Sequence, residues 1–369
     1  MYNNIDIEIK KKKLVDEFIQ NTENFWKEEK KYIDQKHLKI LNTFELRYKK
    51  NIDLYAKELI DWEGQTNLGS PFQFNLKQIK YLGFFELFKQ FLKNLKSSRL
   101  TNYFNKLSFD DDVQIIKKNN GLNILKLLPA HKNFGFKDIY FINEEISSNN
   151  RWNRYVYLAS QIKKKKILSN NGQNWLDIGS YYGGLQMIVK KFNKKNNFFL
   201  LDFNHQLCRS YVNLKILYPN SEHILPNDIN QNMRIKQNAF YYVPVKKYNL
   251  LRKIKFDLVT NFFSFGEMKK KIFKKYFHNN IINNSKVIYV VNRFVSSPYF
   301  EPTYQNDINI FDYYKKDFKV FYFDIFPIHH YKNIYRKVLN KFSYRPISSP
   351  YFEKIMVNKR YSKLFKKKL

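Results

Sequence analysis

The chain has 369 residues, and its 66 Lys and Arg against 32 Asp and Glu give a formal net charge of +34. Hydrophobic residues make up 44% and aromatic residues 18%, which excludes an intrinsically disordered chain and allows a large core. The single cysteine excludes an intramolecular disulfide and a cysteine-based zinc site, and it favours a reducing, cytoplasmic setting.

The positive charge has two interpretations. Nucleic acid or an anionic membrane surface would attract it. The lysines are spread over the whole chain, however, and they accompany heavy use of Asn, Ile, Tyr and Phe, which is typical of an AT-rich genome. We therefore expect a solvated basic surface rather than a nucleic-acid partner. Neither a secretory signal nor an apolar run of about 18 residues is present, so no transmembrane segment is predicted.

The first part of the chain predicts a mainly helical accessory region over 1–147. Apolar residues between 10 and 62, and again between 76 and 95, recur at three, four and seven residues, the spacing of one helical face. The polar run Ser147–Asn150 then breaks the pattern. It predicts a domain boundary, with a second domain over 148–369.

A run of three acids, Asp110–Asp112, lies inside the accessory region. A metal site is one interpretation of it. The favoured one is a helix over 113–118 that is capped by Ser108 or Asp110, because acids stabilise the positive end of a helix.

Strand and helix patterns alternate from 174 to about 293, which predicts an α/β domain with a mostly parallel sheet and helices on both faces. The helices are expected at 151–166, at 206–217 and from 269. The strands are expected at 174–177, 198–202, 223–226, 239–244, 256–261, 286–293 and 318–328.

A glycine-rich stretch follows the first of these strands. Asp177 ends the strand, Gly179, Gly183 and Gly184 follow, and a helical pattern begins at once. Strand, glycine bend and helix form the unit that holds nucleotide-like ligands. Asp202 ends the next strand, near the interval of about 20 residues expected for an acid that binds ribose hydroxyls.

The glycines do not match the dinucleotide pattern, which needs a second glycine where Tyr181 stands. The form Asp177-Ile-Gly-Ser-Tyr-Tyr-Gly-Gly184 instead resembles the motif of class I S-adenosylmethionine-dependent methyltransferases. The resemblance implies a Rossmann-like fold and S-adenosylmethionine as cofactor, with the glycine turn under its methionine part. The cofactor-binding residues that it implies are Asp177, Gly179, Ser180, Tyr181, Gly183, Gly184, Asp202, Asn261 and Ser264.

Two later segments narrow the resemblance. Asp257-Leu-Val-Thr-Asn-Phe-Phe-Ser-Phe-Gly-Glu-Met268 covers the strand expected at 256–261 and the residues after it, and Asn292-Arg293 ends the strand expected at 286–293. Both resemble the sugar O-methyltransferase family, which carries Asn-x-x-Ser-x-x-Glu-Met and Asn-Arg at these places. The resemblance implies methyl transfer to a hydroxyl of a sugar or glycan precursor, as in polysaccharide biosynthesis. Asn292 and Arg293 are then candidates to hold the sugar hydroxyls.

The methylation of a hydroxyl needs a group that takes its proton. Glu267 is the first candidate, with a role at the N-terminus of the following helix as the alternative. His329 and His330 are the second candidates, because a neutral imidazole accepts protons near pH 7. Asp228 is a weaker candidate to accept from the adenine amino group. No histidine pair has metal-ligand spacing, so no metal is predicted.

Two other functions remain open at this point. A nucleic-acid methyltransferase would account for the net charge. A binding protein with a methyltransferase fold and no cofactor is the non-enzymatic alternative.

Overall fold

The structure is a computed structural model, and it describes residues 4–27, 42, 45–46, 103, 105–130, 139–296, 307–331 and 349–363. The chain forms two compact units. Unit 1 comprises 1–62, 161–326 and 349–369, and unit 2 comprises 63–160 and 327–348. The division passes through helix α6 (Asn150–Lys164) and assigns the first residues of the chain to unit 1, whereas the sequence places one boundary at 147/148.

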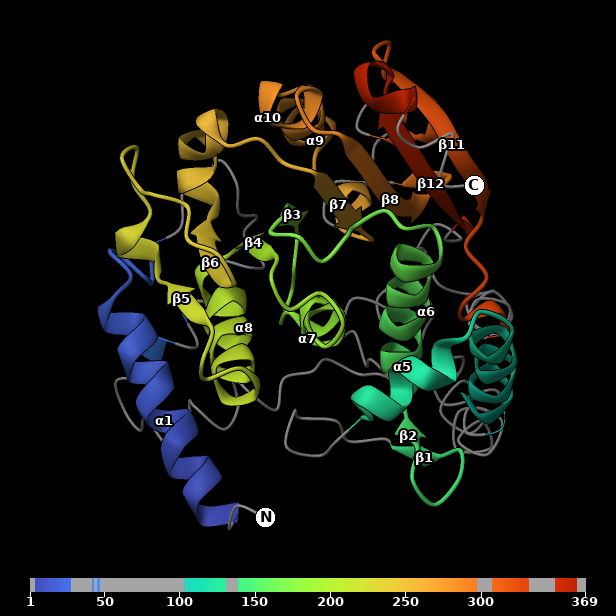
Figure 1. The fold of residues 1–369 in the computed structure, drawn as a ribbon, viewed down its shortest axis with the longest axis horizontal. Coiled ribbons are helices and arrows are strands. Elements are labelled where there is room, and N and C mark those ends of the chain that lie inside the picture. The colour runs from blue at the N-terminus through green and yellow to red at the C-terminus, as the bar shows by residue number, and fades with distance from the viewer. Residues whose placement is uncertain are drawn as a thin grey trace, which may run out of the picture. The chain divides into compact units, whose positions relative to one another are not determined.

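Unit 1 contains an eight-stranded sheet with the order β11-β12-β8-β7-β3-β4-β6-β5 (Figure 1). The strands from β3 to β8 pair in parallel, and β12 is antiparallel to both of its neighbours, β8 and β11. The strands are β3 (Asn174–Ile178), β4 (Asn197–Asp202), β5 (Glu222–Ile224), β6 (Ala239–Pro244), β7 (Leu258–Phe262), β8 (Val287–Arg293), β11 (Phe318–Ile325) and β12 (Tyr351–Asn358).

The strand order reverses at β3, which has β4 on one side and β7 on the other. In sheets of this kind, ligands bind where the order reverses, outside the carboxyl ends of the strands. The glycine turn follows β3 directly, so it lies at this point. The structure therefore confirms the predicted Rossmann-like α/β fold with a mostly parallel sheet.

Helices cover both faces of the sheet (Figure 1). On one face, Lys190 of α7 (Gly184–Lys190) lies over the rings of Phe198 and Phe240, and Tyr211 of α8 (Asn204–Leu217) contacts Tyr242 edge-on. The opposite face packs against η3 (Val245–Lys253), α9 (Lys270–Phe277) and α10 (Asn280–Asn283) in one core that includes Ile178, Leu201, Val243, Val259, Ile288, Phe273, Phe277 and Ile281.

Helix α1 (Asn4–Gln20) belongs to this unit and packs against α8. Val15 and Phe18 are fully buried, and the Phe18 ring lies 5.6 Å from that of Tyr211. The helical pattern that was predicted from residue 10 is therefore correct for its first part. The helices expected later in 10–62 and over 76–95 lie outside the described residues apart from isolated positions.

Unit 2 is described mainly through residues 105–130 and 139–160. Residues 105–118 are helical, and α5 (Gly121–Leu127), the hairpin of β1 (Tyr140–Phe141) and β2 (Ser147–Ser148), and most of α6 follow. One prediction was wrong here. Ser108 and Asp110 lie inside a helix rather than capping one, because Phe109, Val113 and Ile116 extend one buried face.

Short elements complete the chain. They are η2 (Pro226–Asp228), η4 (Phe265–Glu267), the pair β9 (Val295–Ser296) and β10 (Ile308–Asn309), η6 (Ile310–Tyr313) and η8 (Lys359–Tyr361). No described helix is both long enough and apolar enough to cross a membrane.

Candidate active site

The glycine turn joins β3 to α7 with three residues in the left-handed region: Gly179 at φ 76°, Tyr181 at φ 55° and Gly183 at φ 77°. Glycine takes this conformation without steric cost, but tyrosine pays roughly 1–3 kcal/mol for it. The position at which the dinucleotide motif has a second glycine is thus held by a residue that needs support from its surroundings.

Three side chains supply this support to Tyr181. The Asp202 carboxylate accepts from the Tyr181 N–H at 2.7 Å, and the Ser210 hydroxyl donates to the Tyr181 carbonyl at 2.8 Å. The guanidinium of Arg209 lies over the Tyr181 ring at 5.0 Å. Ser210 and Arg209 are both on α8, so this helix fixes the shape of the glycine turn.

Arg209 was not recognised from the sequence. It is 1% exposed, its Nη1 donates to Gln206 at 3.0 Å, and it also lies 5.5 Å from the ring of Tyr182. The attraction between a cation and the face of an aromatic ring is strongest when the cation is removed from water. The only signal for this role in the sequence is the pair of tyrosines in the turn, and nothing local connects that pair to an arginine on the next helix.

Asp202 ends β4 and faces the turn. Its Oδ2 accepts from the Tyr181 N–H at 2.7 Å, and its Oδ1 accepts from the Phe203 N–H at 2.8 Å. Each carboxylate oxygen has a second lone pair, so both can also accept from a ligand hydroxyl. The two backbone bonds fix the orientation of the carboxylate at the edge where the sheet binds ligands.

Asp177 lies at the end of β3, but its side chain is used inside the protein. In the parallel register Asp177 pairs with Thr260 of β7. Thr260 donates to Oδ1 and Gln186 donates to Oδ2, both at 2.5 Å. Burial raises the pKa of Asp177 from 3.8 to about 7. We therefore interpret Asp177 as a structural residue that links β3 to β7 and α7 by hydrogen bonds rather than as a direct contact of a ligand.

This raised pKa predicts a pH effect on stability. Between pH 4 and 7 the folded chain keeps a proton on Asp177 that the unfolded chain releases, so stability falls as pH rises. Asp177→Asn should remove this part of the pH dependence. Between pH 4.5 and 7.5 the wild type should lose up to about 3 kcal/mol more in free energy of unfolding than the variant. Urea denaturation at both pH values measures the difference.

Asp110→Asn is the matched control, because Asp110 is an exposed acid that pairs with Lys106. It should leave the pH dependence of the wild type unchanged. Equal pH dependence in wild type and Asp177→Asn would show that Asp177 is ionised in the folded chain.

A polar network joins the ends of β7 and β8. Asn261 Nδ2 donates to the carbonyl of Ile178 at 2.7 Å and to Ser264 Oγ at 2.5 Å. Asn292 Nδ2 donates to Asn261 Oδ1 at 3.0 Å, and Asn292 Oδ1 accepts from the Gly266 N–H at 3.2 Å. Because Asn292 is fully buried and both ends of its amide are engaged, it holds the loop after β7 and is not placed to contact an acceptor.

Ser180 places a buried hydroxyl in the turn. Ser180 is 5% exposed, and its Oγ has no hydrogen-bond partner among the described residues. Its neighbour Gly179 has no room for a side chain, because a Cβ there would lie 2.2 Å from Ser264 Oγ. Gly183, which precedes Gly184 at the start of α7, packs against α8 and β4. The Ser180 hydroxyl of the turn and the Asp202 carboxylate, which faces the turn from the end of β4, thus fit a polar ligand.

Glu267 ends η4, just after β7, and its side chain is exposed. Its position depends on Gly266, where a Cβ would lie 2.3 Å from Ser296 Oγ. Arg293 ends β8, and its Nε donates to the Tyr351 hydroxyl at 3.2 Å. Asp257 precedes β7 and pairs with Lys286 at the opposite edge of the sheet, where the strands begin.

The two histidines belong to unit 2. The His329 backbone N–H donates to Asp112 Oδ1 at 2.7 Å, and its Nε2 bonds the Asn150 carbonyl. Asp112 is fully buried, so this histidine joins 327–331 to the helices of unit 2. His330 is exposed beside Tyr331. The structure therefore gives His329 a packing role within its own unit.

Asp228 ends η2 after β5 and is exposed. Among the described residues, no group of three His, Cys, Asp or Glu side chains is arranged to hold a metal ion.

No protein-family model and no curated protein matches the chain. Among similar solved structures is a coclaurine N-methyltransferase bound to N-methylheliamine and SAH, at 11% identity over 64% of this chain and 78% of that one, with a TM-score of 0.39. A cyclopropane-fatty-acyl-phospholipid synthase-like protein from Lactobacillus casei is 9% identical over 66% and 99%, with a TM-score of 0.36.

A third is a magnesium protoporphyrin IX methyltransferase from Synechocystis with bound SAM, 11% identical over 71% of this chain and 96% of that one, with a TM-score of 0.32. The molecules named for these proteins have little in common. The resemblance to sugar O-methyltransferases is not confirmed by a family match.

Proposed function

We propose that the chain is an S-adenosylmethionine-dependent O-methyltransferase that transfers a methyl group to a hydroxyl of a sugar or glycan precursor. The observation that carries the methyltransferase part is the bond from the Tyr181 N–H to Asp202, at 2.7 Å. It brings the acid after β4 against the glycine turn after β3, where a sheet of this topology binds its ligand. The sugar part rests on the resemblance of 257–268 and 292–293.

The residues of the turn fit this cofactor. A ribose offers two neighbouring hydroxyls, and the Asp202 carboxylate offers two acceptor oxygens in a fixed orientation. The buried Ser180 hydroxyl lacks a partner among the described residues, and a polar cofactor atom would satisfy it. In this proposal Asp177 does not contact the cofactor but supports the turn through its hydrogen bonds with Thr260 and Gln186.

When bound, S-adenosylmethionine supplies an electrophilic methyl group on a sulfonium centre. The chain has to hold the acceptor hydroxyl in line with it and to remove the hydroxyl proton. We assign the proton to the Glu267 carboxylate, which is exposed at the end of η4. The network of Asn261, Ser264 and Asn292 holds this loop in place, and Arg293 is the proposed contact for sugar hydroxyls.

A transfer assay tests the proposal. The chain is incubated with S-adenosylmethionine labelled in the methyl group and, in separate reactions, with monosaccharides, nucleoside diphosphate sugars and total RNA. We expect label in a sugar fraction, released again by cleavage of a methyl ether. Label in RNA alone would support the nucleic-acid alternative instead. If S-adenosylhomocysteine does not bind in calorimetry, the chain is a binding protein without this cofactor.

A further inference from the structure

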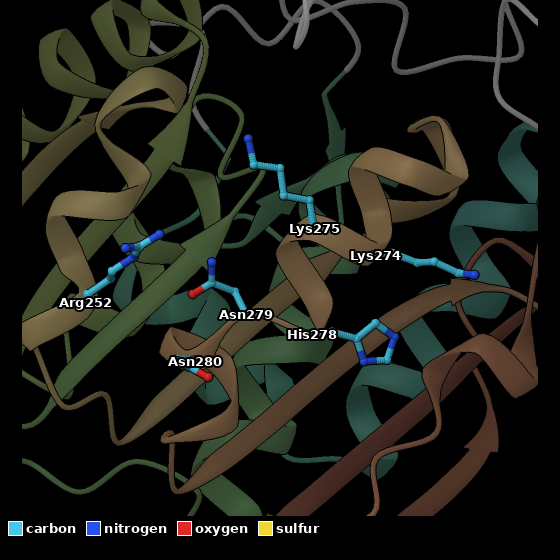
Figure 2. Close-up of a pocket in the computed structure, with 6 residues that line it drawn as sticks. All are labelled: Arg252, Lys274, Lys275, His278, Asn279 and Asn280. Atoms are coloured by element: carbon cyan, nitrogen blue, oxygen red, sulfur yellow. The ribbon is translucent and has the colours of Figure 1, made fainter.

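A polar pocket lies on unit 1, away from the glycine turn (Figure 2). It has a volume of about 410 Å³, within the range of small-ligand sites. Its lining comes from η3, α9 and α10 and consists of Arg252, Lys274, Lys275, His278, Asn279 and Asn280. Figure 2 shows Arg252 on one side, Lys274 and His278 on the other, and Asn279 between them.

This pocket lies at the edge of the sheet where the strands begin. Arg252 is near the end of η3, shortly before β7 starts at Leu258. Asn279 and Asn280 come before the start of β8, at the other side of the pocket. The carbonyl of Lys255 accepts from Asn174, the first residue of β3, which places this connection at the same edge. The glycine turn lies at the carboxyl ends of the strands, so the two sites are separate.

The lining groups are mostly hydrogen-bond donors. Arg252, Lys274 and Lys275 are cations, and the lining includes no Asp or Glu. The Oδ1 of Asn279 accepts from the Ile281 N–H at 3.0 Å, and its amide N–H atoms can donate to a ligand. A guanidinium fork, ammonium groups and amide N–H groups together match an oxyanion with many acceptor atoms.

His278 supports this reading. Burial and the nearby Lys315 and Lys274 lower its pKa, while Asp312 has a smaller opposing effect. Lys315 and the pocket residue Lys274 thus both disfavour a positive charge on His278. A bound anion would relieve the repulsion among Lys274, Lys275 and Arg252, and three cations in one concave site favour a ligand with more than one negative charge.

We infer that this pocket, lined by Arg252, Lys274, Lys275 and Asn279, binds a small anion that carries two or more phosphoryl groups. The observation favours a compact ligand over a nucleic acid, because the lining residues belong to one pocket, with the Arg252 guanidinium near the Asn279 amide, rather than to a continuous basic track (Figure 2). The inference does not depend on the methyltransferase proposal, since the pocket uses none of the residues of the glycine turn.

Calorimetry on the full chain with inorganic tripolyphosphate tests the inference. We expect saturable binding at low salt that weakens as salt rises, because the lining cations are exposed. The double variant Arg252→Gln with Lys275→Gln should weaken binding about tenfold or more. Arg252→Lys keeps the charge but loses the fork, and it should give a smaller loss.

The matched control is Lys117→Gln with Lys118→Gln, which removes the same charge from exposed positions of unit 2. It should leave tripolyphosphate binding unchanged, and all variants should keep wild-type affinity for S-adenosylhomocysteine. An equal loss in both double variants would mean that only net charge attracts the anion, which overturns the inference. No binding of tripolyphosphate, or binding of a single-stranded RNA 20-mer alone, would overturn it as well.

Discussion

Replacing Asp202 with alanine should abolish detectable binding of S-adenosylhomocysteine. Its carboxylate is fixed by the backbone N–H groups of Tyr181 and Phe203, so it is ready to accept two ribose hydroxyls without reorganisation. A hydrogen bond to a charged group contributes about 1.5–3 kcal/mol, and two of them correspond to a change of about 100-fold or more in Kd. Titration calorimetry of wild type and variant with S-adenosylhomocysteine measures the loss.

A second variant separates loss of contact from collapse of the turn. Ser210→Ala removes another support of Tyr181, the bond to its carbonyl, but leaves the Asp202 carboxylate intact. We expect it to weaken binding far less than Asp202→Ala. A comparable loss in both would mean that the turn, rather than the carboxylate, determines affinity. Asp110→Ala controls for the loss of an exposed acid, and wild-type affinity in Asp202→Ala would exclude the proposed cofactor site.

The parts of unit 1 that were predicted correctly are those in which a local pattern determines the structure. Strand β3 is an apolar run with an acid as its penultimate residue, β4 is one that ends in an acid, and Gly179 and Gly183 take the positive φ angles for which glycine is suited. A parallel strand that is buried on both faces is a short apolar run between polar segments, which the sequence displays directly. The position of the candidate site at the carboxyl ends of these strands follows from the same patterns.

The parts that were missed depend on contacts between distant segments. Strand β12 inserts antiparallel between β8 and β11, and nothing near Tyr351–Asn358 indicates which strands it pairs with. The place of Asp177 in the motif predicts a cofactor contact but does not indicate the bonds that its carboxyl group makes in the structure. These bonds join it to Thr260 and Gln186, which come from a neighbouring strand and helix. Spacing along the chain does not report where a side chain points once the sheet is formed.

The same limit applies to the support of Tyr181 by Arg209. A tyrosine at a position that favours glycine is visible in the sequence as a departure from the motif. The compensation lies on the next helix, where the guanidinium meets the ring at 5.0 Å. Residues in strained conformations persist when their surroundings hold them, and such places tend to be functional. Tyr181, where the sequence departs from the glycine motif, is thus an informative position of the turn. The motif alone does not indicate that Arg209 is its partner.

Replacing Glu267 with glutamine should lower the rate of methyl transfer by roughly 10²–10⁴ while leaving the affinity for S-adenosylhomocysteine unchanged. Glutamine keeps the size of the side chain but does not accept a proton. The loop that carries it should keep its shape, because the Phe265 N–H bonds Asn261 Oδ1 at 3.0 Å and the Gly266 N–H bonds Asn292 Oδ1. The measurement is the initial rate of label transfer to the sugar fraction identified in the transfer assay, at saturating cofactor.

The alternative for Glu267 is an acid that stabilises the N-terminus of α9, which begins at Lys270. In that case the variant would lose roughly 0.3–1 kcal/mol of stability. It would keep its rate of methyl transfer, because the interaction with the helix dipole stabilises the fold and takes no part in the reaction. Glu222→Gln is the matched control, since Glu222 is an exposed acid of the same unit that pairs with Lys236. Its rate should equal that of the wild type.

The pH profile distinguishes the remaining outcomes. A rate that rises with pH in the wild type and loses that rise in Glu267→Gln identifies the carboxylate as the group that takes the proton. Loss of S-adenosylhomocysteine binding together with the rate would mean that Glu267 holds the cofactor instead. A full rate in the variant would exclude Glu267 as the base and direct the same test to His330, which is exposed, and to His329, whose Nε2 bonds the Asn150 carbonyl in this structure.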